Sequence, residues 1–332
     1  MKYNKFLVTG SAGFIGFHLS RALLQEGYEV IGYDNLNDYY DPILKQARLK
    51  ILNTYANFIF YKEDIADCKT LEKVIRLHNI KFIINLAAQA GVRYSITSPQ
   101  TYMYSNVIGM FNILECCRNC EVEQLLYASS SSVYGNSQEE KFKETQMVDH
   151  PISLYAATKK CNELIAHVYS NNFSINTVGL RFFTVYGPFG RPDMAYYHFT
   201  EKIIKGEPIQ VYNYGNQYRD FTYIDDLING ILRLIKRRDS SKMNGEYKVY
   251  NIGNGVPIKL LDFICTLQEA IGKKAKLEYV SRMTGDVEKT YADITLLQEE
   301  TGYNPSTNIK QGIEAFYNWY QTYIDELEKV NK

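Results

Sequence analysis

Short apolar runs alternate with segments of helical period over the first 180 residues of the chain. Strands are predicted at residues 5–9, 29–35, 57–64, 81–88 and 124–131, and the segments between them that show helical period include residues 18–27, 68–78 and 105–117. Strands that alternate with helices predict a parallel sheet covered on both faces. With right-handed crossovers, the expected fold is α/β with a doubly wound, Rossmann-like parallel sheet.

The alternation loosens beyond residue 180, where glycine and other turn formers cluster in GPFGRPDM, YNYGNQYRD and NIGNGVP. We predict a first domain at residues 1–180 and a smaller α/β lobe, mainly for binding substrate, at residues 181–332. Because residues 247–253 have the character of another strand of the first sheet, we expect the two parts to be interleaved.

Charge and composition exclude several classes of protein. Lysine plus arginine and aspartate plus glutamate number 37 each, so no net field favours nucleic acid or an anionic membrane. The chain has no run of about 18 apolar residues, and its first residues lack the apolar segment of a signal peptide. We therefore expect a cytoplasmic protein with no nucleic-acid or membrane partner.

The six cysteines are sparse and lack the paired spacing of a disulfide framework, so we predict reduced thiols. Cys117 and Cys120 form a C-x-x-C, a spacing that can indicate a zinc or redox site. No second C-x-x-C or histidine pair completes a zinc set. We interpret them as the end of an amphipathic helix and predict no metal.

A glycine pattern, G-S-A-G-F-I-G, connects the first predicted strand to the first helix. Glycines at its first, middle and last positions allow a tight turn, the approach of backbone to a pyrophosphate, and close helix packing. Asp34, at the end of the second strand, is placed to accept hydrogen bonds from an adenosine ribose and to repel a 2′-phosphate, so we predict NAD. The residues assigned to this part of the cofactor site are Gly10, Ala12, Gly13, Phe14, Ile15, Gly16, Asp34 and Asn35.

Residues after the third and fourth strands extend the predicted cofactor site. Asp64 and Ile65 are candidates for its adenine edge, although Asp64 is equally suited to a helix N-cap or a turn. Ala87, Ala88 and Gln89 would let a dinucleotide lie across the strand ends, and core packing is an alternative explanation for them.

Tyr155 and Lys159 form a Y-x-x-x-K pattern in a predicted helix, and this spacing puts both side chains on one helical face. An ammonium near the phenol stabilises the phenolate and lowers the tyrosine pKa, which would make Tyr155 a general base. The chain has 29 tyrosines, so the pattern alone can arise by chance.

Four serines, Ser129 to Ser132, end the fifth predicted strand, where parallel sheets bind ligands. Strand alternation would put Ser130 and Ser132 on one face, so either or both could bond the substrate hydroxyl that is oxidised. The alternative is a polar turn with N-capping serines.

Together these motifs resemble the extended short-chain dehydrogenase/reductase family over nearly the whole chain, and within it they are most similar to UDP-glucuronate 4-epimerases. The runs that carry the likeness are DNLNDYYDP (34–42), LAAQAGVRYS (86–95), YASSSSVYG (127–135), DHPISLYAATKK (149–160), LRFFTVYGPFGRPDMA (180–195) and RDFTYIDD (219–226).

The resemblance implies reversible C4 epimerisation of UDP-glucuronate to UDP-galacturonate through a transient 4-keto intermediate and bound NAD. Tyr155 would be the base, and Lys159 would lower its pKa and hold the nicotinamide ribose. Ser130 matches the hydroxyl that polarises O4, with Ser132 as the rival. The same likeness separates this chain from two relatives, because 4,6-dehydratases have an Asp-Glu pair near the serine strand and decarboxylases typically have glutamate where Ser132 stands.

The resemblance also implies a substrate site. Arginines would bind the anionic groups of the UDP-sugar, with Arg93 the weaker candidate for the carboxylate, and threonine stands where UDP-galactose epimerases usually have asparagine. A loop near the C-terminus resembles the family's uridine-ribose loop. Besides Ser130, the residues assigned to the substrate are Arg93, Thr184, Arg191, Arg219, Arg282 and Asp286.

Two other functions stay open: 4-epimerisation of UDP-glucose/UDP-galactose or a UDP-N-acetylhexosamine, and a non-catalytic NAD-binding sensor. Helices predicted at residues 100–118 and 153–172 have apolar residues on more than one face, as in family dimers, so we expect a homodimer.

Overall fold

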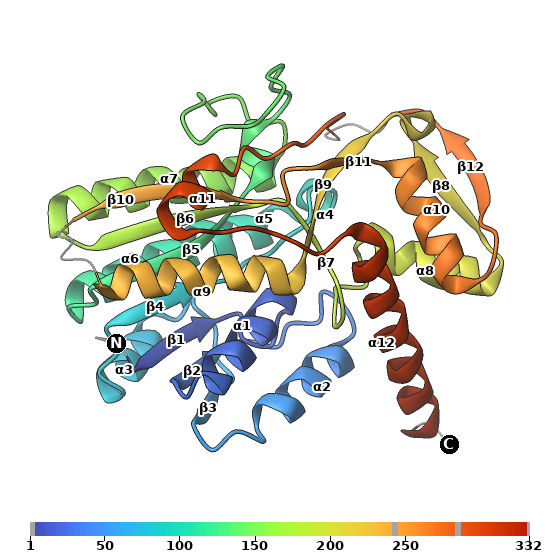
Figure 1. Cartoon of the computed structure of the whole chain (residues 1–332). Helices are drawn as coiled ribbons and strands as arrows, with labels where there is room; N and C mark the ends of the chain where they lie inside the picture. Colours follow the sequence, from blue (N-terminus) through green and yellow to red (C-terminus); the bar gives the residue numbers. More distant parts are fainter. Residues whose placement is uncertain (1–3, 241–244, 283–286, 331–332) are drawn as a thin grey trace.

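Seven parallel strands form the main sheet of the computed structural model, which describes residues 4–240, 245–282 and 287–330 (Figure 1). The strand order is β10-β6-β5-β4-β1-β2-β3, and every neighbouring pair is parallel. The strands are β1 (Lys5–Thr9), β2 (Glu29–Tyr33), β3 (Phe58–Tyr61), β4 (Phe82–Asn85), β5 (Gln124–Ser130), β6 (Asn176–Phe182) and β10 (Tyr247–Ile252). The predicted doubly wound α/β fold is confirmed.

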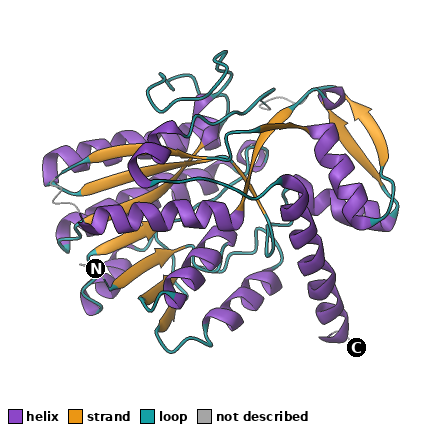
Figure 2. Cartoon of the chain, viewed as in Figure 1, coloured by secondary structure: helices purple, strands orange, loops and turns teal. Residues whose placement is uncertain are grey.

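Helices cover both faces of this sheet (Figure 2). On one face α1 (Phe14–Gln25) contacts α2 (Pro42–Leu52) and α9 (Ile224–Ser240), and on the other α6 (Gly109–Asn119) contacts α3 (Cys68–Leu77) and α7 (Leu154–Phe173). A separate cluster of buried apolar side chains lies on each face. The short helices α4 (Tyr94–Thr97) and α5 (Pro99–Tyr102) and the π-helix η1 (Met103–Ile108) precede α6.

The smaller lobe has its own two sheets and core. A three-stranded sheet contains β7 (Thr184–Tyr186), β9 (Tyr218–Tyr223) and β11 (Pro257–Lys259), and β8 (Pro208–Tyr212) pairs with β12 (Lys276–Val280). A third apolar cluster joins the helices α8 (Ala195–Lys205), α10 (Leu260–Ile271) and α12 (Ile309–Val330). In Figure 1 this lobe stands to the right of the main sheet.

The chain returns from the smaller lobe to the main sheet. Strand β10 follows β9 and α9 in the chain, yet it pairs with β6 from Tyr247 opposite Thr177 to Ile252 opposite Phe182. Helix α11 (Thr295–Thr301) then packs on α9 and β10. The two parts are therefore interleaved, and the division at residue 180 stays a prediction.

The order of the strands determines where a ligand can bind. Strands β1 and β4 are neighbours, and the chain winds outward from them in both directions. Such a switch point leaves a crevice at the carboxyl ends of the strands. Within the described ranges, none of the helices has both the length and the apolar character needed to cross a membrane.

Candidate active site

A cavity of about 410 Å³ opens at the carboxyl ends of the main-sheet strands and reaches the smaller lobe. This volume is in the usual range for small-molecule and cofactor sites. Most of the sequence-predicted residues line it: Gly10, Gly13, Phe14, Ile15, Gly16, Asp34, Asn35, Asp64, Ile65, Ala87, Ala88, Gln89, Ser130, Ser132, Tyr155, Lys159, Thr184 and Arg191.

The glycine turn after β1 leaves no room for side chains. Gly10 has φ +68°, and a Cβ there would lie 2.8 Å from the backbone nitrogen of Ala87. A Cβ on Gly16 would lie 2.0 Å from the carbonyl oxygen of Gly10. Gly13 is the N-cap of α1, and no side chain of the described residues caps this helix end. The helix N-terminus therefore faces the cavity with backbone N–H groups and its partial positive charge, an arrangement that suits a diphosphate.

Asp34 directly follows β2 as a buried carboxylate held by backbone amides. Its Oδ2 accepts a hydrogen bond from the N–H of Ala12 at 3.1 Å, and its Oδ1 accepts one from Leu36 at 2.8 Å. Ala12 does not line the cavity and acts through this bond. Asn35 donates to Asp64 at 2.9 Å, so these two predicted cofactor-site residues lie together. The glycine turn and this oriented carboxylate fit the diphosphate and ribose of NAD.

The segment after β4 connects the cofactor side of the cavity to helix α7. The backbone N–H of Gln89 donates to Oδ1 of Asn106 at 2.8 Å, and Nδ2 of Asn106 donates to the Gln89 carbonyl at 3.0 Å. The same amide group donates to the Thr158 hydroxyl at 3.1 Å. Sequence analysis missed Asn106, which lies in the π-helix η1, and π-helical turns often occur at functional sites.

Tyr155 and Lys159 occupy the first turns of α7, whose N-terminus is capped by Ser153 through a 3.1 Å hydrogen bond from Ala156. Lys159 Nζ donates to the carbonyl of Ala128 on β5 at 2.8 Å. Burial lowers the pKa of Lys159 to about 8. Its Nζ lies 5.9 Å from the centroid of the Tyr155 ring.

The net shift of the Tyr155 pKa is upward, and the lowering of that pKa by Lys159 stays a prediction. Burial raises the pKa of Tyr155, while a hydrogen bond with Ser130 and the charge of Arg191 act in the opposite direction. The reason is that both partners of the motif are withdrawn from water, which penalises the phenolate and the ammonium alike.

The serines meet through a helical turn rather than through strand alternation. Strand β5 ends at Ser130, and residues 131–134 form the 3-10 helix η2 (Ser131–Tyr134). Ser130 Oγ caps this helix by accepting from the Ser132 N–H at 3.2 Å, and it lies 3.2 Å from Ser132 Oγ. Ser130 is therefore both an N-cap and a cavity residue, so the two alternatives considered for it coexist.

The smaller lobe contributes Thr184 at the start of β7 and Arg191 in the following loop. Asp193 holds the Arg191 guanidinium through two hydrogen bonds of 2.9 and 2.5 Å, and Tyr39 donates to the same carboxylate at 3.2 Å. Burial would lower the pKa of Arg191, but the Asp193 carboxylate raises it, so the net shift is upward. A fixed cation thus faces the cavity.

Two buried cations of α2 were missed by sequence analysis. Lys45 lines the cavity and donates to the backbone and side-chain oxygens of Asn37 at 2.9 and 2.8 Å. Arg48 donates to the carbonyls of Ala12 and Phe189 at 2.8 and 2.7 Å, which connects the glycine turn to the Arg191 loop. Both lie on the same helical face as the buried leucines of α2, and this pattern could have identified them.

Three predicted arginines lie outside the cavity lining. The guanidinium of Arg93 stacks on the Tyr212 ring at 4.6 Å, that of Arg219 donates to backbone carbonyls that include Val287 at 2.7 Å, and that of Arg282 donates to Asn136 at 3.4 Å. The predicted residue Asp286 falls outside the described residues.

Comparison with known proteins identifies the group to which this geometry corresponds. The NAD dependent epimerase/dehydratase family matches residues 6–253. The chain is 46% identical to the protein CapI of Staphylococcus aureus, with 96% of this chain and 99% of that protein covered. It is 44% identical to UDP-glucuronate 4-epimerase 4 of Arabidopsis thaliana, with 98% and 77% covered.

Solved structures give the same picture. UDP-glucuronic acid 4-epimerase from Bacillus cereus, in complex with UDP-glucuronic acid and NAD, superposes with a TM-score of 0.90 at 35% identity over 96% of this chain and 99% of that one. UDP-glucose 4-epimerase from Thermotoga maritima, with UDP-glucose, gives a TM-score of 0.86 at 28% identity over the same fractions.

Proposed function

This chain belongs to the NAD dependent epimerase/dehydratase family, and we propose that it is an NAD-dependent UDP-sugar 4-epimerase that interconverts UDP-glucuronate and UDP-galacturonate. The observation that carries the proposal is that one cavity joins the glycine turn and Asp34 with Tyr155, Ser130 and Arg191. A cofactor site and a proton-transfer site therefore open onto the same space, and relatives with this architecture include UDP-glucuronate 4-epimerases.

The residues of the cavity have distinct roles in this proposal. Tyr155 takes the proton from O4 of the sugar and returns it, and Ser130 bonds the same oxygen, with Ser132 as its rival. When bound, NAD supplies the acceptor to which the C4 hydride passes and from which it returns on the opposite face, so no net oxidation results. Lys159 orients the cofactor side of the site.

For Tyr155 to act as the base, the cavity must offset the cost of ionising a buried phenol. Burial raises the pKa of Tyr155 and so disfavours the phenolate, while Ser130 and Arg191 both act to lower that pKa. Arg191 also offers a fixed cation to the anionic substrate, next to Thr184. We assign Arg191 and Thr184 to the sugar end of the substrate, where a uronate carboxylate adds a negative charge.

Proton NMR of UDP-glucuronate with the purified protein tests the proposal. The expected result is the appearance of the galacto isomer in the anomeric and H4 signals, at constant total sugar nucleotide, without added NAD if the cofactor is retained. No change even after NAD is added would refute the uronate assignment, and turnover of UDP-glucose instead would favour the hexose alternative. Loss of the carboxylate would identify a decarboxylase and refute the interpretation of Ser132.

We also propose that two copies of the chain associate through η1, α6 and α7. Large apolar side chains are exposed along this face, among them Tyr104 at 56%, Phe111 at 43%, Leu164 at 57% and Val168 at 50%. Helices α6 and α7 contact each other, so these exposed apolar side chains lie on neighbouring elements, and clustered exposed apolar side chains are typical of interaction sites. Light scattering is expected to give a dimer mass, and a monomer for Leu164→Glu; a wild-type monomer at micromolar concentration would refute the proposal.

A further inference from the structure

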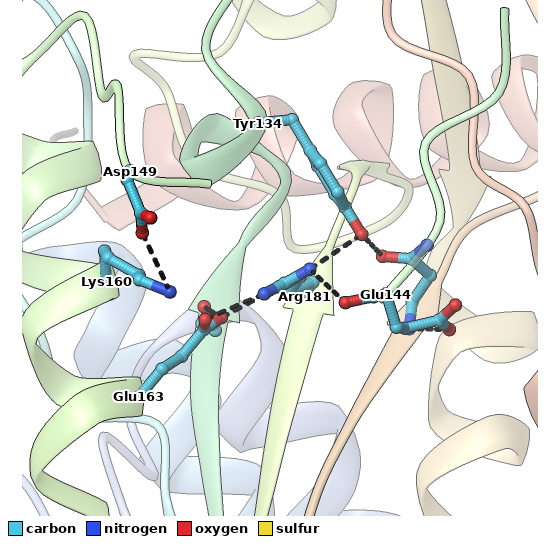
Figure 3. Close-up of polar contacts among 8 residues, drawn as sticks. Tyr134, Glu144, Asp149, Lys160, Glu163 and Arg181 are labelled. Atoms are coloured by element: carbon cyan, nitrogen blue, oxygen red, sulfur yellow. Dashed lines mark hydrogen bonds and ion pairs between the residues drawn. The ribbon is translucent and has the colours of Figure 1, made fainter. Parts of the chain in front are cut away.

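A buried ion pair lies behind the catalytic cavity and takes no part in the chemistry proposed above. Glu163 on α7 is 2% exposed and Arg181 on β6 is 3% exposed. Arg181 donates to Oε1 of Glu163 from Nε at 2.9 Å and to Oε2 from Nη2 at 2.8 Å, so the pair is bidentate (Figure 3). Taking two charges out of water is costly in free energy, so stability alone does not explain why the pair is buried here.

The ion pair bonds to both ends of the segment that carries the site serines. Ser129, directly before Ser130, donates to Oε1 of Glu163 at 2.6 Å. Arg181 Nη1 donates to the hydroxyl of Tyr134, the last residue of η2, at 3.0 Å. Figure 3 shows Arg181 between Glu163 and Tyr134. Glu163 and Arg181 therefore hold the residues on either side of the segment from Ser130 to Ser132, Ser129 before it and Tyr134 after it.

Tyr134 is in turn anchored to a third strand. Its hydroxyl donates to Oδ1 of Asn251 on β10 at 2.7 Å, and Nδ2 of Asn251 donates to the carbonyl of Phe142 at 2.7 Å. The far end of η2 is therefore held against the sheet by a chain of hydrogen bonds, in which each donor has a defined acceptor.

The ion pair also continues the catalytic face of α7. Tyr155, Lys159 and Glu163 follow one another at intervals of four residues, so they lie on one helical face. Each interacts with the end of β5: Tyr155 with the Ser130 hydroxyl, which acts to lower its pKa, Lys159 through a hydrogen bond to the Ala128 carbonyl, and Glu163 through a hydrogen bond from Ser129. The first two contacts belong to the proposed chemistry, and the third holds the strand and the helix in the same register.

We propose that Glu163, oriented by Arg181, is a positioning residue that holds Ser130 at its working distance from Tyr155 and from the sugar hydroxyl. This inference rests on the proposed function. A carboxylate suits the task because its two oxygens accept from Ser129 and from both guanidinium nitrogens at once, which an apolar pair of the same volume cannot do. Displacements of about 1 Å in a catalytic group can cost about 100-fold in rate.

Ser129→Ala and Glu163→Gln test the inference, with Lys160→Gln as the matched control. Ser129→Ala removes one hydrogen bond and leaves the ion pair intact, so it is expected to fold even if Glu163→Gln does not. Lys160 is on the same helix, but its partner is Asp149 at 3.6 Å, outside the network (Figure 3). The control is expected to behave as wild type.

We expect kcat on UDP-glucuronate to fall by about 10- to 100-fold in Ser129→Ala, with KM changed by less than about threefold. The pH at which kcat is half-maximal is expected to rise, because a displaced Ser130 no longer lowers the pKa of Tyr155. A purely structural role would leave that pH unchanged. Equal kcat and equal pH profiles in Ser129→Ala and wild type would overturn the inference.

Hydrogen exchange of residues 129–135 provides a readout that does not depend on the substrate. Exchange in this segment is expected to accelerate about tenfold or more in Ser129→Ala and Glu163→Gln and to stay unchanged in Lys160→Gln. Unchanged exchange in both network variants would refute the positioning role. If the wild type does not act on UDP-glucuronate, the proposed function fails, while the exchange data still decide whether Glu163 holds the serine segment.

Discussion

Replacing Lys159 with methionine is expected to stabilise the protein while it abolishes epimerisation. Lys159 is 3% exposed, and no carboxylate of the described residues forms a salt bridge with it. Its Nζ is held by one backbone carbonyl, that of Ala128. An ammonium in such surroundings is penalised by desolvation, and methionine fills a similar volume without the charge.

The size of the effect follows from the pKa of Lys159, which burial lowers from 10.5 to about 8. At about 1.36 kcal/mol per pKa unit, this difference amounts to about 3 kcal/mol at pH values below about 8. Methionine cannot donate a hydrogen bond to the Ala128 carbonyl, and this loss reduces the gain in stability by about 1 kcal/mol. We therefore expect Lys159→Met to raise the free energy of unfolding by about 2 kcal/mol near pH 7.

The pH dependence gives the sharper test. Between about pH 8 and 10.5 the unfolded wild-type chain binds the lysine proton while the folded protein has released it, so wild-type stability rises with pH in this window. The advantage of Lys159→Met is therefore expected to shrink as the pH rises through about 8 toward 10.5. Urea denaturation of the NAD-free proteins, followed by circular dichroism, measures both quantities without stabilisation by bound cofactor.

Lys160→Met is the matched control. Lys160 carries the same charge on the same helix, but its side chain is 21% exposed and lies 3.6 Å from Asp149. Its replacement is expected to change stability by less than about 1 kcal/mol. A Lys159→Met protein that is no more stable than wild type near pH 7, with a difference independent of pH, would refute the view that the site retains a buried ammonium at the expense of stability.

Three further predictions concern the rest of the site. Tyr155→Phe is expected to lower kcat on UDP-glucuronate by about 100-fold or more with circular dichroism unchanged, and near-wild-type turnover would exclude Tyr155 as the base. Asp34→Asn is expected to weaken NAD binding by about tenfold in calorimetry and to reduce the discrimination against NADP, because the repulsion of a 2′-phosphate is lost. Arg48→Met is expected to raise KM and to alter the fluorescence emission of Trp319, the single tryptophan. Arg48 holds the carbonyl of Phe189, whose ring centroid is 5.0 Å from that of Trp319. Unchanged KM and emission would contradict a coupling between Arg48 and the Phe189 loop.

The elements with short-range signals were predictable from the chain. The glycine turn, the strand that precedes Asp34 and the helix that carries Tyr155 and Lys159 each depend on residues a few positions apart, through a positive φ, an apolar run or a helical repeat. The structure contains all of them. The end of β5 was less predictable, since a serine run suits both a strand and an N-capped turn, and the chain changes from one to the other at Ser130.

By itself, then, the sequence determined the doubly wound sheet, the cofactor turn and the Y-x-x-x-K face, because local sterics and periodicity specify them. Tertiary structure alone decided the rest. Glu163 and Arg181 are 18 residues apart and Arg48 and Phe189 are 141 apart, so no local sequence pattern predicts their contacts. It also decided the sign of the Tyr155 pKa shift, because the cost of ionising a phenol depends on how much water the whole fold excludes from the cavity.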